Sequence, residues 1–272
     1  MTDDVAYVLG SSSPEVARLD AQSAAIESAT DLLLRRAGIE AGQRVLDLGT
    51  GPGHVAFALA NIVGPSGSVV GVDRDPRMLA LADARRDESG LGNVRFVEGD
   101  ARTYRDDEAF DGVVMRLLLM HLPDRRQVVK HHEAALRQGG RLVLLDYDGG
   151  ALRAEPKIEL VDQIREWLLA GFRAANADAS VGTRLAALLR EARLADVATM
   201  GVQAYCAPDD PRAAAMFTEL ARSMAPAIIG SGAATEDELG LDTLQDRLER
   251  AQAAADAVLL PPTLVAAWGL RR

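Results

Sequence analysis

Three glycines at alternate positions, Gly49, Gly51 and Gly53, mark the part of the chain with the clearest chemical capacity. They follow a short apolar run that contains Asp47, and the pattern of an amphipathic helix follows them. Glycine has no side chain, so a ligand can lie close against the bare backbone of such a turn. The backbone N–H groups at the start of the next helix face the same turn. This pattern predicts a binding loop for a nucleotide-like ligand.

The spacing of these glycines discriminates among nucleotides. A phosphate-binding loop needs a Lys-Ser/Thr pair after its last glycine, and no such pair follows Gly53. A dinucleotide-binding fingerprint reads G-x-G-x-x-G, whereas here the third glycine comes one residue early and His54 stands at the position of glycine. A nicotinamide-dependent oxidoreductase is therefore an alternative that the glycine spacing opposes.

Two more carboxylates end the next apolar segments. Asp73 follows the segment 68–72, about twenty residues past the last glycine, which is the distance at which such folds place a carboxylate on a ribose. Its two oxygens can accept hydrogen bonds from both hydroxyls of the diol. Asp100 follows the segment 94–97 within a Gly-Asp-Ala sequence. Because open α/β sheets bind ligands at the carboxyl ends of their strands, we expect both carboxylates to face the glycine turn.

The sequence DLGTGPG, from Asp47 to Gly53, resembles motif I of the class I S-adenosylmethionine-dependent methyltransferases. The segment 116–124 resembles the R-x-x-L-x-H-L-x-D sequence that follows the fourth strand in bacterial small-molecule methyltransferases. Ordered motifs carry the resemblance over residues 45–146. It implies S-adenosylmethionine as the cofactor, with Asp100 bonded to the adenine amino group and a backbone carbonyl at the end of the fourth strand bonded to the ligand ammonium.

The resemblance implies further contacts along the chain. Met115 and Arg116 end the fourth strand, and Met78 could cover the adenine ring or pack in the core. Tyr7, Arg18 and Gln22 resemble an N-terminal segment that folds over the cofactor and would contact its methionine end or the substrate, and a solvated helix face is the alternative. The predicted cofactor contacts are Tyr7, Gln22, Asp47, Gly49, Thr50, Gly51, Asp73, Arg74, Met78, Asp100, Ala101, Met115 and Arg116.

His121 is the predicted catalytic residue, because an imidazole can remove a proton near neutral pH. Its alternative role is structural, pinning the loop or capping the next helix. Tyr147, at the end of the fifth strand, is the second catalytic candidate and could orient a substrate. Asp146 and Asp148 beside it could accept a proton, although polar residues at any strand end give this pattern. We expect no metal site there, since too few oxygen ligands are suitably spaced.

Between the fourth and fifth strands, the sequence predicts a helix over 127–137 that ends in a glycine cap at Gly139. His131 and His132 fall in the middle of this helix. We therefore expect both histidines to be solvated.

The alternation of apolar segments and helical patterns predicts an α/β fold. It comprises a Rossmann-like, seven-stranded, mostly parallel sheet with helices on both faces, an N-terminal helical segment and a helical insertion before the last strand. We expect residues 1–40 to form a helical lid and residues 41–272 a methyltransferase domain, with helical cap insertions at about 151–192 and 208–258. Such insertions roof the active site in enzymes of this fold, so their apolar residues are substrate contacts or core: Met216, Phe217, Met224 and Ile228.

Composition limits the partners. The chain has 272 residues, 48% of them hydrophobic, and a formal net charge of −10, so polyanions are repelled and nucleic acids are poor substrates. Cys206 is the single cysteine, which excludes an internal disulfide. No segment has the length of a membrane helix and no leader pattern opens the sequence, so we expect a cytoplasmic protein without a membrane partner. A homodimer is left open.

Together, these features predict methyl transfer from S-adenosylmethionine to an O or N atom of a small-molecule metabolite. The sulfonium already carries an activated methyl group, so the protein has mainly to align the reacting atoms. A noncatalytic or non-methylating S-adenosylmethionine-binding protein of the same fold retains every motif and is the first alternative. A macromolecular methyltransferase and a nicotinamide-dependent oxidoreductase are the others.

Overall fold

A computed structural model describes residues 13–272, which fall into two compact units. The core unit contains the described chain up to Asp146, together with Arg184–Met200 and Val265–Arg272. The helical unit contains Tyr147–Thr183 and Gly201–Leu264. The chain therefore leaves the core twice to build the helical unit. The division into a lid segment and a methyltransferase domain, and the roofing role of the insertions, stay predictions.

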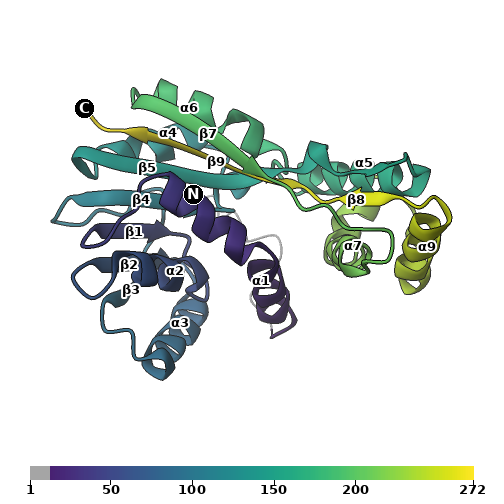
Figure 1. Ribbon diagram of the computed structural model, residues 1–272, viewed down its shortest axis with the longest axis horizontal. Coiled ribbons are helices and arrows are strands. Elements are labelled where there is room, and N and C mark those ends of the chain that lie inside the picture. Colours follow the sequence, from purple (N-terminus) through teal and green to yellow (C-terminus); the bar gives the residue numbers. More distant parts are fainter. Residues whose placement is uncertain (1–12) are drawn as a thin grey trace. The chain divides into compact units, whose positions relative to one another are not determined.

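The core unit is built on a seven-stranded sheet in the order β3-β2-β1-β4-β5-β9-β7 (Figure 1). The neighbouring pairs from β3 to β5 are parallel, and the aliphatic residues of β1, β2, β4 and β5 are buried as expected for strands covered on both faces. This sheet confirms the predicted fold class. The strands are β1 (Arg44–Leu48), β2 (Ser68–Asp73), β3 (Val94–Glu98), β4 (Phe110–Arg116), β5 (Leu136–Asp148), β7 (Ala195–Val202) and β9 (Thr263–Leu270).

Helices of the core unit pack on this sheet and on each other. Helix α2 contacts β1 and β2, α3 contacts β2 and β3, and α4 packs on α6. The start of α3 follows the rules for a helix N-terminus, because Asp75 accepts a hydrogen bond from the Arg77 amide at 2.9 Å and Pro76 is the first helical residue. The helices are α1 (Ser13–Arg36), α2 (His54–Val63), α3 (Pro76–Ser89), α4 (Arg125–Glu133) and α6 (Leu185–Glu191), with the 3₁₀ turn η1 (Leu119–His121).

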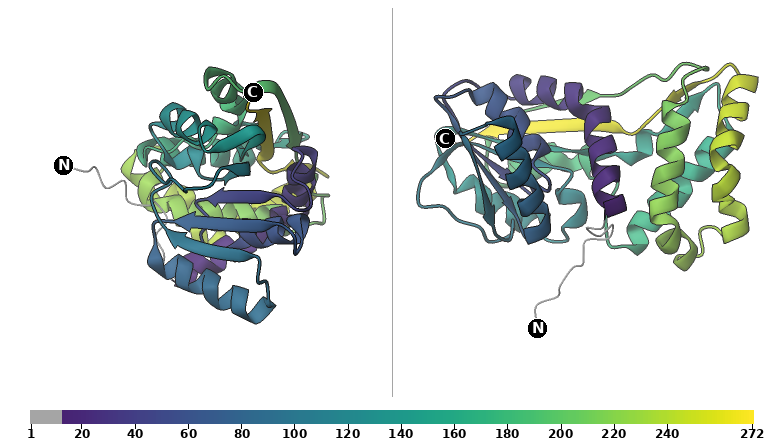
Figure 2. Two further views of the ribbon diagram at one scale, coloured as in Figure 1. Left: turned by 90° about the vertical axis from the view of Figure 1, so that its left-hand side faces the viewer. Right: turned by 90° about the horizontal axis from the view of Figure 1, so that it is seen from below.

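The helical unit has its own apolar core, in which α7 packs on α5 and α9 (Figure 2). Phe217, Met224 and Ile228 of α7 are fully buried, whereas Met216 is half-buried. A two-stranded antiparallel sheet, absent from the sequence prediction, joins β6 to β8. The elements are η2 (Gly149–Ala151), β6 (Arg153–Glu155), α5 (Glu159–Ala174), η3 (Val181–Arg184), α7 (Arg212–Gly230), α8 (Glu236–Leu239), α9 (Leu241–Ala254) and β8 (Val258–Leu260).

The predicted helix over 127–137 with a glycine cap is wrong in its second half. Helix α4 ends at Glu133, and β5 already begins at Leu136. Gly139, with φ 78°, lies within the irregular start of β5, where its N–H donates to the carbonyl of Arg271 at 2.8 Å. The Arg271 N–H in turn donates to Gly140 at 2.9 Å. Pairing with the end of the last strand therefore outweighs the local helical preference of this segment.

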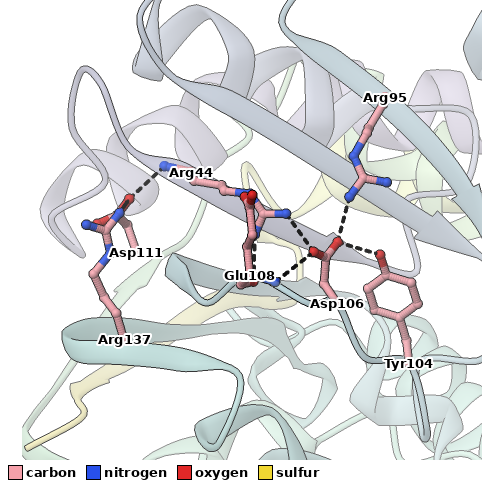
Figure 3. Close-up of polar contacts among 7 residues, drawn as sticks. All are labelled: Arg44, Arg95, Tyr104, Asp106, Glu108, Asp111 and Arg137. Atoms are coloured by element: carbon pink, nitrogen blue, oxygen red, sulfur yellow. Dashed lines mark hydrogen bonds and ion pairs between the residues drawn. The ribbon is translucent and has the colours of Figure 1, made fainter.

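The loop between β3 and β4 is anchored at the start of β1 by a cluster of charged side chains (Figure 3). Asp106 accepts hydrogen bonds from Arg44 at 2.8 Å, from Arg95 at 2.5 Å and from the Tyr104 hydroxyl at 3.0 Å. Burial opposes ionisation of Asp106, but hydrogen bonds from the Glu108 amide, Arg44 and Tyr104 outweigh it and lower its pKa to about 2. The cluster fixes the return path of the chain from β3.

Within the described part of the chain, no helix combines the length and the apolar character needed to cross a bilayer.

Candidate functional site

The glycine turn connects β1 to α2 and is tied to the neighbouring strand β2. Gly49, Gly51 and Gly53 have φ values of 71°, 52° and 90°, which other residues rarely adopt. The N–H groups of Gly49 and Thr50 donate to the carbonyl of Val72 at 2.8 and 3.0 Å. A Cβ atom added at Gly51 would meet no other atom within 4 Å. The backbone of Gly51 is thus exposed on the open side of the turn. A side chain at this position would fill the space that a ligand could occupy.

Asp47 is the innermost carboxylate of the site. Its side chain lies in β1, only 1% of the residue is exposed, and Oδ2 accepts a 2.6 Å hydrogen bond from the Thr50 hydroxyl. Burial raises the pKa of Asp47 to about 6, although the Thr50 bond and the positive charge of Arg116 act in the opposite direction. A ligand cation near this carboxylate would stabilise its ionised form.

Asp73 joins the end of β2 to the glycine turn. Its Oδ2 accepts the N–H of Gly51 at 2.8 Å, and its Oδ1 accepts the N–H of Asp75 at 3.0 Å. A carboxylate offers about four lone-pair sites, so each oxygen can accept one further hydrogen bond. The geometry therefore suits an acceptor for two neighbouring hydroxyls.

Asp100 follows β3 and is bound by Arg102, a residue that sequence reasoning missed. The Arg102 backbone N–H donates to Oδ1 at 2.8 Å, and its guanidinium donates to both oxygens at 2.5–3.0 Å. Hydrogen bonds from the Arg102 side chain lower the pKa of Asp100, and the charge of Arg74 adds to this effect. Asp100 is therefore ionised at neutral pH and its carboxylate has a defined orientation.

His121 belongs to η1, a turn that other residues hold in place. Asp146 is 1% exposed at the end of β5, and its Oδ2 accepts the N–H of Met120 at 3.1 Å. Arg125 Nε donates to the carbonyl of Leu119 at 2.9 Å. Asp146, one of the predicted proton acceptors, thus holds the turn on which His121 lies.

The backbone and charges around His121 are unusual. Leu117, just after β4, has a φ of 53°, which is rare for a residue with a branched side chain. Burial lowers the pKa of His121 to about 4, and the positive charges of Arg18 and Arg74 lower it further. The imidazole is therefore neutral at physiological pH, the form that can accept a proton.

Helix α1 is bound to the end of β4 through Arg116. The guanidinium of Arg116 donates to the hydroxyls of Thr30 at 3.2 Å and Ser23 at 3.1 Å, and both hydroxyl residues are buried. The predicted contact at Arg116 was its backbone carbonyl, and this contact stays a prediction. Ser23 and Thr30 were not predicted, although their spacing of seven residues places both on one face of a helix.

A second link binds α1 to the helices beside the glycine turn. Asp20 Oδ1 accepts a 2.8 Å hydrogen bond from Nε2 of His54, the first residue of α2. Its other oxygen accepts a bond from Arg85 of α3 at 2.8 Å. This second link too was absent from the sequence prediction.

The remaining predicted residues are spread over several elements. Met115 is buried at the end of β4 beside Leu48 of β1, and Met78 is buried in the first turn of α3. Gln22 is half-buried on α1, and Tyr147 opens the helical unit. Tyr7 lies outside the described residues. Among residues 13–272, no three histidine, cysteine or acidic side chains are grouped so that they could hold a metal ion.

The expectation that His132 is solvated is wrong. His132 is completely buried, and its Nε2 donates to the carbonyl of Ala101, one of the predicted cofactor contacts, at 2.5 Å. Its neighbour His131 donates to the carbonyl of Tyr104 at 3.0 Å. Both histidines lie in the last turn of α4, because the helix is shorter than predicted.

A Rossmann-like sheet with a glycine turn after its first strand and acidic residues at its next strand ends defines the class I S-adenosylmethionine-dependent methyltransferases. Residues 39–187 match the family described as "Methyltransferase domain", and the chain belongs to this family. The family predicted from the sequence is thereby confirmed, and S-adenosylmethionine is the methyl donor of this class.

Three curated relatives show the extent of the similarity. A demethylmenaquinone methyltransferase of Geobacillus kaustophilus is 35% identical over 115 residues, 42% of this chain and 49% of the relative. The uncharacterised methyltransferase YcgJ of Bacillus subtilis is 35% identical over 117 residues, 43% and 45% of the two chains. A ubiquinone/menaquinone biosynthesis C-methyltransferase of Hahella chejuensis is 33% identical over 114 residues, 41% and 46% of the two. The chain thus spans about half the length of the curated relatives it matches.

Solved structures support the fold. The crystal structure of YcgJ from Bacillus subtilis aligns with a TM-score of 0.54 at 22% identity, covering 90% of this chain and 99% of that one. A putative methyltransferase from Bacillus halodurans aligns with a TM-score of 0.58 at 20% identity, covering 90% and 100%. At these identities, the likeness concerns the fold alone.

Proposed function

We propose that the protein transfers the methyl group of S-adenosylmethionine to an O or N atom of a small-molecule metabolite. One observation carries the proposal: the hydrogen bond from Gly51 to Asp73 brings a carboxylate against a bare-backbone turn, beside a buried Asp47. The cofactor supplies an activated methyl group, so the chain has to recognise it and align the acceptor. Both a monomer and a homodimer are compatible with this function.

The three carboxylates divide the recognition of the cofactor. Asp73 accepts hydrogen bonds from the ribose diol through the lone pairs that Gly51 and Asp75 leave unused. Asp100 accepts a bond from the adenine amino group, and Asp47 attracts the ammonium of the methionine end. The other proposed contacts are Tyr7, Gln22, Gly49, Thr50, Arg74, Met78, Ala101, Met115 and Arg116.

His121 accepts the proton that the acceptor loses. Its pKa of about 4 makes it a weak base, but it is neutral and able to accept a proton at pH 7. A hydroxyl oxygen becomes far more acidic as it bonds to the methyl carbon, so a weak base is sufficient for an oxygen acceptor, whereas a neutral amine can keep its proton as the ammonium product. The turn η1, held by Asp146 and Arg125, fixes the backbone of this residue. Tyr147 is the second candidate for this role.

A carbon acceptor is the competing assignment, since several similar proteins are named C-methyltransferases. The proposal is tested by incubating the full chain with S-adenosylmethionine labelled in the methyl group and with panels of phenols, amines and quinols. Label should enter a phenol or an amine, and mass spectrometry should locate it on O or N. Label on carbon would overturn the choice of acceptor atom.

The same assay separates methyl transfer from mere binding. Asp73→Asn should abolish most of the transfer, whereas Asp107→Asn, at an exposed carboxylate, should leave it unchanged. A folded chain that binds S-adenosylhomocysteine and labels no compound in any panel would favour a noncatalytic binding protein. Binding of NADH in place of S-adenosylhomocysteine would indicate an oxidoreductase.

A further inference from the structure

The loop after Asp100 is held by helix α4 through two neighbouring histidines. His132 Nε2 donates to the carbonyl of Ala101 at 2.5 Å, and His131 Nε2 donates to the carbonyl of Tyr104 at 3.0 Å. The two rings meet edge to face, with centroids 4.8 Å apart. Consecutive side chains of α4 thus bind both ends of one short loop.

Burying the polar imidazole of His132 at this position costs folding stability. It is completely buried, its Nδ1 finds no hydrogen-bond partner among the described residues, and burial lowers its pKa to about 4. A buried polar atom without a partner costs stability, so an apolar residue would pack there at lower cost. What an apolar residue could not supply is the hydrogen bond to Ala101.

That hydrogen bond acts on the same peptide group that orients Asp100. The C=O of the Ala101–Arg102 peptide accepts from His132, and the N–H of this peptide donates to Asp100 Oδ1 at 2.8 Å. Because a peptide group is planar, a bond that fixes its C=O also fixes the direction of its N–H. His132 and the Asp100 carboxylate are therefore coupled through one rigid plane.

We propose that His132 is a positioning residue for adenine recognition: it fixes the Ala101–Arg102 peptide and thereby presents the Asp100 carboxylate to the amino group of the cofactor's adenine. This role rests on the proposed function, in which Asp100 receives that amino group. Loss of the His132 bond frees the peptide to rotate, so Asp100 Oδ1 loses its backbone donor and only the flexible Arg102 side chain still orients the carboxylate.

The test compares two ligands that differ only at that amino group. S-Adenosylhomocysteine carries it, whereas the purine-riboside analogue of S-adenosylhomocysteine has a hydrogen atom in its place. The wild-type chain should prefer S-adenosylhomocysteine by about a hundredfold. A site built to accept a hydrogen bond from a ligand N–H rejects an analogue that lacks this group. His132→Met should reduce this ratio to about tenfold or less. His132→Gln, whose amide N–H can reach Ala101, should retain most of the preference.

The matched control is His131→Met, since the His131 bond to Tyr104 is outside the Ala101–Arg102 peptide and its loss should leave the ratio intact. Thermal unfolding of each variant shows whether it is folded. If His132→Met does not fold, His132→Asn replaces it, because the shorter amide cannot reach Ala101, and its ratio must fall in the same way.

The outcomes separate the two proposals. A wild-type chain that binds neither ligand refutes the proposed function. A wild-type chain that discriminates, with folded His132 variants that discriminate equally well, refutes the positioning role and leaves the proposed function intact. If the His132 variants bind both ligands more weakly but keep the wild-type ratio of affinities, the positioning role is also refuted, because a merely structural role predicts that result.

Discussion

The carboxylate of Asp73 accepts the backbone N–H of Gly51 at 2.8 Å, so the end of β2 and the glycine turn after β1 are joined by one hydrogen bond. Strands β1 and β2 pair in parallel with Asp47 opposite Gly71. This register places the glycine turn after β1 next to the end of β2. The bare backbone at Gly51 and the predicted ribose acceptor therefore keep a fixed relation. Substitutions at the turn, at the carboxylates and at His121 should have separable effects on binding, stability and rate.

Gly51→Ala should weaken S-adenosylhomocysteine binding by at least about tenfold, because a Cβ would stand on the open side of the turn. The positive φ of 52° adds a conformational cost of about 1–2 kcal/mol. Gly90→Ala is the matched control, since Gly90 has a φ of 68° and equally open surroundings at the end of α3. Both variants should lose similar stability in denaturant unfolding. Equal affinities in calorimetry would show that no ligand approaches Gly51.

Asp47→Asn should raise stability at pH 7.5 and have little effect at pH 4. The folded-state pKa of about 6 lies above the value near 3.9 of an unfolded aspartate, so the stability that protonated Asp47 contributes is present below pH 4 and is lost as the pH rises through 6. The gain from removing the buried charge is about 2–3 kcal/mol. Urea unfolding at both pH values measures it, and a gain of the same size at pH 4 would show that burial of the charge is not its cause.

His121→Ala should slow methyl transfer by about a hundredfold or more while leaving cofactor affinity unchanged. Because its pKa is about 4, the wild-type rate at saturating S-adenosylmethionine, where ionised Asp47 is already occupied by the ammonium, should be flat from pH 7 to pH 5 and should fall only below that range. His131→Gln serves as the control for loss of a nearby histidine. A rate that persists in His121→Ala would assign this residue to the structure of η1, and a rate loss centred near pH 6.5 would contradict the burial effect.

Asp106→Asn should destabilise the protein by about 1–3 kcal/mol, because it weakens the bonds to Arg44, Arg95 and Tyr104. Its folded-state pKa of about 2 lies below the unfolded value, so its contribution is present above about pH 4 and is lost as the pH falls toward 2. Asp107→Asn, at an exposed position, should change stability by less than about 0.5 kcal/mol. Urea unfolding at pH 7 gives both values, and equal losses would refute the role of the cluster.

The sequence was informative where the signal is local. The strands around Asp47 and Asp73 are short buried runs ended by acidic residues and glycines, and the cap at Asp75 is a property of neighbouring residues. These signals need no knowledge of the rest of the fold. Strands of only three residues, such as β6 and β8, are too short to show a period and were missed for that reason.

Contacts between distant segments were beyond this reasoning. His132 appeared to lie in the middle of a solvated helix, and only the fold brings it to Ala101, 31 positions earlier. Arg116 binds Ser23 across 93 positions, a pairing that no local pattern encodes. The start of β5 was also misread, since its partner Arg271 comes from the far end of the chain. Contacts between residues far apart in the sequence therefore account for the wrong predictions and for the parts of the site that were not predicted.

Calorimetric titration of the folded full chain with S-adenosylhomocysteine tests the central claim most directly. We predict binding at one site per chain, weakened about tenfold or more by Asp73→Asn, because this variant replaces a charged acceptor of the ribose hydroxyls. Asp107→Asn should bind as the wild type does. A wild-type chain with a cooperative unfolding transition that gives no heat with S-adenosylhomocysteine or S-adenosylmethionine would contradict the account.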